Sequence, residues 1–221
     1  MSASRAWTAE EDRLRRRMYW LLGATFVHVL FEGGLGLVVS IVTGSLALHA
    51  HSIQALIEGG AAFLALRHLP RLSDTEEDHS RHEHRLARWI GIAFLLLAAY
   101  VAARGVHELL EGHHAEPTLL GLLLTIYAAL VMPIVGWVKF RTARRLGSEG
   151  LAAEAKESIS CAILSFLTLV AMAGGLLGAP GWLDPALSLL MVPWFLREGL
   201  AHVRGRVHAH LAGGFAHGKH G

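Results

Sequence analysis

The stretch TLLGLLLTIYAALVMPIVGWV, residues 118–138, contains no charged side chain. A helix needs about 20 predominantly apolar residues to cross the hydrocarbon core of a bilayer, so this stretch predicts a transmembrane helix. The same rule applied along the chain predicts six spans, and we expect an all-α, six-helix transmembrane bundle. The spans are Tyr19–Thr43, Ser45–Arg67, Trp89–Leu110, Thr118–Val138, Leu151–Leu177 and Leu183–Val203.

Composition indicates the same class of protein. Hydrophobic residues make up 53% of the 221-residue chain and charged residues only 17%, with a mean hydropathy of +0.42. One soluble domain does not need that much apolar content. The single cysteine excludes an intramolecular disulfide framework, so helix packing must hold the fold together. The net charge of +2 is small and the basic residues gather beside apolar segments, so nucleic-acid binding is not indicated.

Lysine and arginine positions predict the orientation of the spans. Basic residues gather before residue 18, within 67–88, within 139–145 and from 197 onward, whereas the other three connections contain none. Basic loops remain on the cytoplasmic side, so we expect a multi-pass protein of the cell (inner) membrane with both termini in the cytoplasm. The expected organisation is a cytoplasmic segment over 1–17, a transmembrane domain over 18–203 and a His-rich cytoplasmic tail over 204–221.

The second and fifth spans carry polar residues that a lipid-facing helix would reject, and these residues reveal a repeat. Moving the chain by 103 positions places GSLALHAHSIQALIE (44–58) over GSEGLAAEAKESISC (147–161) without a gap. Each copy has polar residues spaced i, i+3, i+7, which puts them on one helix face. Equivalent positions are offset by three spans and so run in opposite directions, and we expect an inverted repeat of three plus three helices, as many transporters have. The aligned pairs are His51 with Glu154, Gln54 with Glu157 and Glu58 with Cys161.

The helical rise of about 1.5 Å per residue predicts the depth of these side chains. Glu58 and Glu157 should face each other roughly 10 Å from the inner face of the membrane. Gln54 and Cys161 should share a level near the midplane. Carboxylate oxygen and thiolate sulfur are ligands for tetrahedral zinc, and thiolate disfavours magnesium and calcium. The spacing therefore predicts a four-ligand metal cage made by these residues.

Two further residues extend this candidate site, Glu154 toward the cytoplasmic mouth and His51 toward the outer one. A carboxylate at the centre of a membrane helix costs about 2.5–3.5 kcal/mol, so function rather than packing explains Glu58 and Glu157 better. For the other four candidate residues, a purely structural role remains an alternative. A lone buried Cys often acts as a small hydrophobe, and a Gln amide can bond a neighbouring helix. Snorkelling or interfacial roles are equally open to His51 and Glu154.

Three motifs carry a resemblance to a known family. They are SLALHAHSIQALIEGGAAFLALR (45–67), LAAEAKESISCAILS (151–165) and WLDPALSLLMVPWFLREG (182–199). These segments resemble the second, fifth and sixth helices of cation diffusion facilitators, and the similarity covers nearly all of the membrane region. The chain looks most similar to a compact branch that lacks the C-terminal cytoplasmic domain, since it also stops soon after the sixth span.

The resemblance implies roles for particular residues. Gln54 and Glu58 match the two metal-binding positions of the family's second helix, and Glu157 and Cys161 match the pair in the fifth. Gln54 departs from the usual acidic residue or histidine, because a neutral amide attracts a cation less and cannot release a proton. Asp184 matches an Asp-Pro entry to the sixth helix, where a capping role is favoured. The resemblance also implies a homodimer.

Glu32 and several clusters of histidines are further candidate metal-binding groups. Glu32 in the first span is a candidate extra acidic wall of the site. The chain has 15 histidines, and several cluster in HSRHEHR (79–85), GHH (112–114) and the tail beyond 204. Clustered imidazoles suit delivery of zinc, copper or nickel, but such tracts are equally typical of solvated loops.

These observations predict a divalent transition-metal exporter, with Zn²⁺ as the preferred transported substrate, and not an enzyme. The acidic and thiol ligands must lose protons to bind metal, so proton antiport is expected. The expected partners are membrane lipid, divalent metal ions and protons, with no organic cofactor. A metalloprotease is disfavoured because HELLEGHH (107–114) has Glu111 where HExxH needs histidine. A nontransporting membrane metal sensor or metal-binding scaffold is the alternative.

Overall fold

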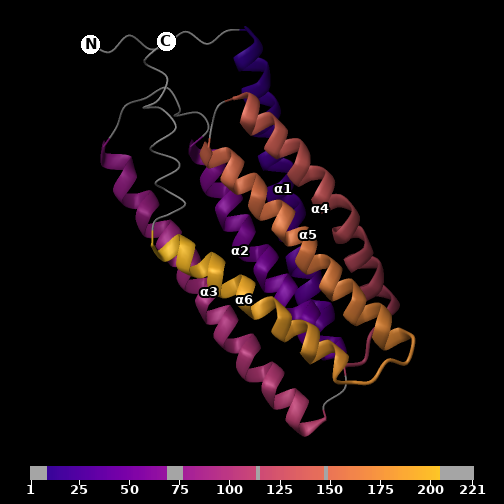
Figure 1. Cartoon of the computed structure of the whole chain (residues 1–221). Helices are drawn as coiled ribbons and strands as arrows, with labels where there is room; N and C mark the ends of the chain where they lie inside the picture. Colours follow the sequence, from indigo (N-terminus) through magenta and orange to yellow (C-terminus); the bar gives the residue numbers. More distant parts are fainter. Residues whose placement is uncertain (1–8, 69–76, 113–114, 147–148, 205–221) are drawn as a thin grey trace.

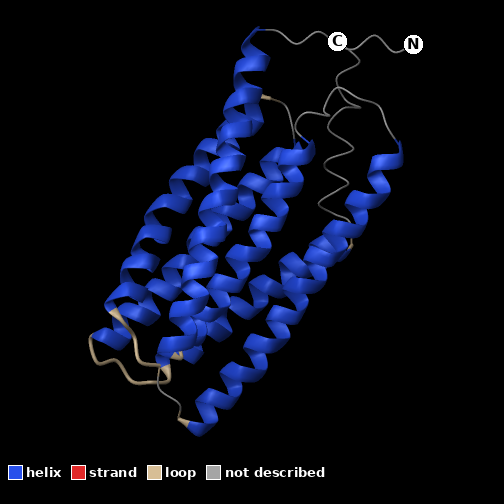
Figure 2. Ribbon diagram, turned by 180° about the vertical axis from the view of Figure 1, so that it is seen from behind, coloured by secondary structure: helices blue, strands red, loops and turns tan. Residues whose placement is uncertain are grey.

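The computed structural model describes residues 9–68, 77–112, 115–146 and 149–204. The described residues form six helices and no strand, and consecutive helices run in opposite directions (Figures 1 and 2). The all-α, six-helix bundle expected from the sequence is confirmed, with one helix for each predicted span. The helices are α1 (Ala9–Thr43), α2 (Leu46–His68), α3 (Glu77–Glu111), α4 (Leu119–Arg145), α5 (Glu149–Leu176) and α6 (Leu183–Val203).

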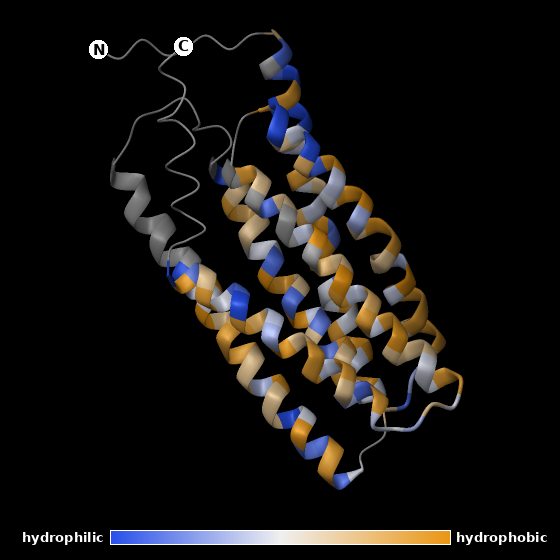
Figure 3. Ribbon diagram, viewed as in Figure 1, coloured by the Kyte–Doolittle hydropathy of each residue, from blue (hydrophilic) through white to orange (hydrophobic). Residues whose placement is uncertain are grey.

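The outside of the bundle is apolar. Trp20, Phe31, Val42 and Leu177 have exposed fractions between 68% and 88%, and Figure 3 shows apolar residues predominating along the helices. By length and apolar composition, three described helical segments are able to cross a membrane, and α5 contributes a shorter apolar part. The second and sixth helices are not among them, and α2 carries several buried polar residues. The three segments are Asp12–Thr43, Arg88–Glu111 and Leu119–Arg145, and the apolar part of α5 is Cys161–Leu176.

A glycine follows the C-terminus of each odd-numbered helix, at the end of the bundle opposite to the start of α1. Gly44, Gly112 and Gly178 follow α1, α3 and α5 with φ of 66°, 71° and 82°. Glycine adopts this left-handed conformation without steric cost, which makes it the usual residue after a helix C-terminus. These turns lie in the three connections that contain no Lys or Arg. We call the end that carries them the outer end and the opposite end the inner end.

The helix contacts follow the predicted repeat. α1 packs on α2 as α4 packs on α5, and α2 contacts α3 as α5 contacts α6. The pairs α1–α4, α2–α5 and α3–α6 join the two halves. Gly33 and Gly136, which are 103 positions apart, fill equivalent places. A Cβ at Gly33 would lie 3.0 Å from the Ser52 carbonyl oxygen, and one at Gly136 would lie 3.0 Å from the Ile159 nitrogen. Small residues allow such close helix approach in membranes.

The two sides of the α2–α5 pair differ in polarity. Toward α3 and α6 lies an apolar cluster that includes Ala50, Phe94, Leu164 and Phe195. Buried polar side chains lie instead on the side of α2 and α5 that meets α1 and α4. The packing therefore places a polar seam between α2 and α5 on the side of α1 and α4.

Candidate functional site

The seam consists of matched polar stripes on α2 and α5. On α5, Glu154, Ser158, Cys161 and Ser165 recur every three or four residues, which places them on one helix face, and all are buried. The facing stripe of α2 is also buried, and α1 and α4 each add one charged residue. We call the whole set the polar column. Its members are Glu32, His51, Gln54, Glu58, Lys139, Glu154, Ser158, Cys161 and Ser165.

The central part of the column joins predicted ligands of α2 and α5. The Cys161 thiol donates to the Gln54 Oε1 carbonyl at 3.4 Å, and the Gln54 amide donates to Glu58 Oε2 at 3.4 Å. Ser158 Oγ donates to Glu58 Oε1 at 2.9 Å. The contacts agree with the shared level expected for Gln54 and Cys161. Glu157 precedes Ser158 in α5, and its side chain lies outside the described residues.

The inner part of the column contains a buried basic residue, Lys139. Lys139 begins the basic segment that the sequence predicts on the cytoplasmic side, and the structure shows that its side chain is fully buried in the bundle rather than exposed. The Lys139 ammonium donates to Glu154 Oε1 and, at 2.8 Å, to Ser158 Oγ. Ser158 in turn donates to Glu58. A fixed positive charge therefore lies two hydrogen bonds from the central carboxylate, and the predicted gateway residue Glu154 is its ion-pair partner.

The outer part of the column contains imidazoles. His51 Nε2 lies 3.0 Å from Glu32 Oε1, and His28 Nε2, one turn earlier on α1, lies 2.9 Å from Glu32 Oε2. Ser165 Oγ lies 3.5 Å from His51 Nε2. Glu32, expected as an acidic wall of the site, is thus in contact with the predicted outer gateway residue His51.

The donor set of the column fits a borderline transition metal. Carboxylate, thiol and imidazole groups are all zinc ligands, and the combination is unsuited to magnesium. Among the side chains that the structure describes, no three from His, Cys, Asp and Glu are already arranged to hold a metal ion. Instead, Gln54 joins the Cys161 thiol to Glu58 through hydrogen bonds, and Ser158 donates a further hydrogen bond to Glu58. A cation entering the centre would replace these hydrogen bonds.

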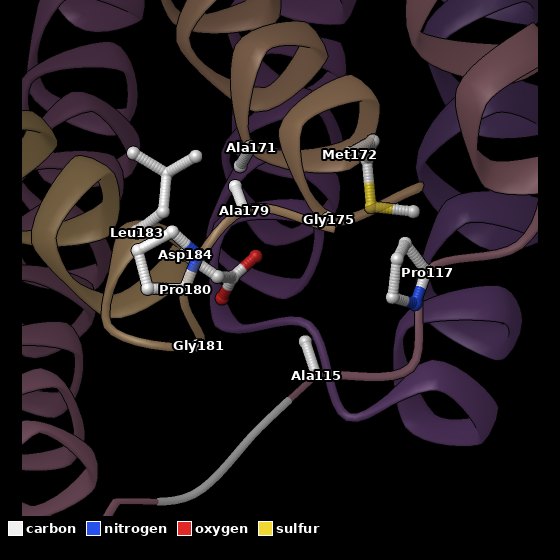
Figure 4. A pocket seen from close by; sticks show the side chains of 10 residues that line it. All are labelled: Ala115, Pro117, Ala171, Met172, Gly175, Ala179, Pro180, Gly181, Leu183 and Asp184. Atoms are coloured by element: carbon white, nitrogen blue, oxygen red, sulfur yellow. The ribbon is translucent and has the colours of Figure 1, made fainter. Parts of the chain in front are cut away.

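Asp184 has a structural position at the outer end. Its Oδ2 accepts hydrogen bonds from the Leu46 and Ala47 backbone N–H groups at 2.8 and 3.2 Å, and its Oδ1 accepts one from Ser45 Oγ at 2.6 Å. These are orphan donors at the start of α2, so Asp184 caps that helix from α6. Figure 4 shows it lining a cavity of about 130 Å³ with Met172 and neighbouring loop residues. The column residues are not among the residues that line this cavity.

Sequence reasoning missed four residues of this region: His28, Lys139, Ser158 and Ser165. A signal existed for three of them. His28 is four positions before Glu32, and Ser158 and Ser165 continue the helical stripe of Glu154 and Cys161. Lys139 gave no such signal, because its burial depends on how α4 packs against α5. The predicted histidine clusters at 79–85, 113–114 and beyond 204 lie outside the side chains that the structure describes.

An apolar exterior around a buried column of polar and charged side chains is typical of a polytopic α-helical membrane protein. Residues 24–207 match the cation efflux transmembrane domain, and the chain belongs to that family.

Three relatives show how far the similarity extends. An uncharacterized transporter of Synechocystis sp. is 26% identical over 161 residues, covering 71% of this chain and 52% of the relative. Metal tolerance protein C1 of Arabidopsis thaliana is 26% identical over 175 residues, covering 72% and 37%. Metal tolerance protein 2 of Oryza sativa subsp. japonica is 25% identical over 194 residues, covering 74% and 50%. The matched region spans about half or less of each relative.

Proposed function

We propose that this protein moves a divalent transition metal ion, zinc being the preferred candidate, out of the cytosol in exchange for protons. One observation carries the proposal: a buried polar column with the Glu58 carboxylate and the Cys161 thiol at its centre. Membership of the cation efflux family and similarity to proteins named for metal tolerance support it. The proposed setting is the inner membrane, with both termini cytoplasmic and two copies of the chain forming a homodimer.

The proposed path follows the column from the inner end to the outer end. Metal enters past Glu154 and binds between Glu58 and Glu157, with Gln54 and Cys161 completing the cage. It leaves past His51 when the two halves of the bundle rock about the α2–α5 contact. The carboxylates and the thiol bind metal only after losing protons, so loading releases protons and protonation releases the metal.

The test compares the two proposed glutamate ligands with Glu108, a glutamate that is buried like Glu58 but lies on α3. Glu58→Gln and Glu157→Gln remove a proposed ligand, whereas Glu108→Gln removes a carboxylate that pairs with Arg104 within α3 at 2.7 Å. Purified protein in proteoliposomes is supplied with Zn²⁺ while metal uptake and internal pH are recorded together. We expect zinc flux with opposite proton flux in the wild type and in Glu108→Gln, and loss of both in the other two variants.

Two results would contradict the proposal. Zinc flux that persists in both Glu58→Gln and Glu157→Gln would remove the proposed cage. Zinc binding by the wild-type protein without any flux in vesicles would favour the alternative, a membrane metal sensor or metal-binding scaffold. Parallel assays with cadmium, cobalt, nickel, manganese and iron(II) identify the metal that the protein prefers.

A further inference from the structure

The outer part of the column contains more metal-binding groups than a gateway needs. His28, Glu32 and His51 bring two imidazoles onto one carboxylate, with nitrogen–oxygen distances of 2.9 and 3.0 Å. Glu32 and His51 are each only 2% exposed. We call these three residues the outer cluster. They come from adjacent helices, α1 and α2, so the packing of that pair holds them together.

Several polar atoms of the outer cluster lack a hydrogen-bond partner among the described residues. Glu32 Oε2 and His28 Nε2 lie close together, yet neither makes a directed hydrogen bond, and His51 Nδ1 also has none. A buried polar atom without a partner costs about 1–3 kcal/mol, so such atoms are rarely left unused. A metal ion bonded to the Glu32 carboxylate and to the ring nitrogens that face it would satisfy Glu32 Oε2 and His28 Nε2 directly.

The chemistry of the outer cluster suits zinc, and its side chains would have to move apart to surround an ion. Two His and one Glu form a common zinc ligand set, with metal–ligand distances of about 2.0–2.2 Å. Two such ligands on a tetrahedral ion lie about 3.3 Å apart, so the observed separations need to widen by only a few tenths of an ångström. An outer partner is present for His28, because Tyr127 Oη lies 3.4 Å from its Nδ1, the ring nitrogen that does not face Glu32. Such contacts orient metal-binding imidazoles.

We infer that the outer cluster is a second metal site, one helical turn outward from the central cage, that binds Zn²⁺ or a similar borderline ion through His28, Glu32 and His51. It lies next to the centre because His51 is three residues from Gln54 on α2, and Ser165 is four residues from Cys161 on α5. A metal leaving the thiol would thus find imidazole ligands before it reaches the outer end. The inference rests on the proposed transport of a transition metal.

Cobalt(II) distinguishes the two sites by their ligands. The central cage contains the Cys161 sulfur, so Co²⁺ bound there gives a sulfur-to-cobalt charge-transfer band. The outer cluster contains only nitrogen and oxygen donors, so Co²⁺ bound there gives ligand-field bands alone. The full-length protein in detergent or nanodiscs is titrated with Co²⁺, and the number of bound equivalents is measured alongside the spectrum.

The variants separate the sites one at a time. We expect two equivalents in the wild type. Glu32→Gln should weaken the sulfur-free equivalent by at least about tenfold and leave the charge-transfer band in place. Cys161→Ser should remove the charge-transfer band and leave the sulfur-free equivalent in place. Thr25→Val is the matched control, because it removes another buried polar group of α1, one whose hydroxyl donates to the Leu21 carbonyl of its own helix. His28→Gln, which sits nearer the surface, repeats the test if Glu32→Gln fails to fold.

These binding measurements test the second site without any measurement of transport. Unchanged Co²⁺ binding in folded Glu32→Gln and His28→Gln would overturn the inference and leave the outer cluster as an ion pair that holds α1 to α2. The inference would also be overturned if the wild-type protein bound a single equivalent of Co²⁺ and Cys161→Ser abolished that binding. Failure of the proposed function appears elsewhere, as zinc binding without vesicle flux.

Discussion

The inner and outer parts of the polar column each contain a buried glutamate, but the partners of the two glutamates differ. At the inner side Glu154 pairs with the ammonium of Lys139, and at the outer side Glu32 contacts the imidazoles of His28 and His51. An ammonium group is a donor only, whereas a neutral imidazole offers a lone pair to a metal. We propose that the partner decides whether a buried carboxylate of the column serves as half of an ion pair or as a metal ligand.

The repeat explains why this difference arises on two similar halves. Lys139 lies 103 positions after Gly36, so the two residues occupy equivalent places on α4 and α1. A Cβ at Gly36 would lie 2.4 Å from Ser52 Oγ, which shows how closely α1 approaches α2 there. On α4 the same place holds a long side chain that reaches Glu154 and Ser158. The two halves share a fold but have different charges along the path.

The largest effect is expected from breaking the inner pair. Lys139→Met should lower the free energy of unfolding by about 3–5 kcal/mol, because it leaves the buried Glu154 carboxylate without its counter-charge. Thermal or denaturant unfolding in detergent measures the change. The double variant Lys139→Met/Glu154→Gln should recover most of the loss. Equal stability of the single variant and the wild type would show that Glu154 does not depend on Lys139.

A smaller effect is expected from the residue that links the inner pair to the centre. Ser158 accepts from Lys139 and donates to Glu58, so it orients a proposed ligand without being one. Ser158→Ala should weaken metal binding by about 10–100-fold, as loss of other outer-shell partners does, while the protein stays folded. Calorimetric titration with Zn²⁺ measures it. An unchanged affinity would mean that the orientation of Glu58 does not depend on Ser158.

The smallest effect is expected at the helix cap. Asp184→Ala removes the acceptor for the first N–H groups of α2, which should cost about 1 kcal/mol of stability and leave zinc affinity unchanged. The measurement pairs an unfolding curve with a zinc titration on the same sample. Loss of zinc binding in folded Asp184→Ala would place this carboxylate among the ligands and extend the column to the outer end.

Sequence periodicity predicted the bundle and the polar stripes of α2 and α5 because both are local properties of single helices. Apolar runs mark the helices, and the spacing of Gln54, Glu58 and Cys161 marks a common face. The partners of those faces could not be predicted in the same way. Lys139 lies near a basic segment and looked like a membrane anchor, and only the contact of α4 with α5 buries it. His28 likewise acquires its neighbour His51 from the packing of α1 on α2.

The central claim is that a metal ion binds in the middle of the column, beside the thiol of the chain's single cysteine. The rate at which a small thiol reagent modifies Cys161 in membranes therefore tests it directly, since no other residue of the chain offers a thiol. We predict that Zn²⁺ slows the modification in the wild type and that Glu58→Gln abolishes this protection. An equal rate with and without Zn²⁺ in the wild type would contradict the account.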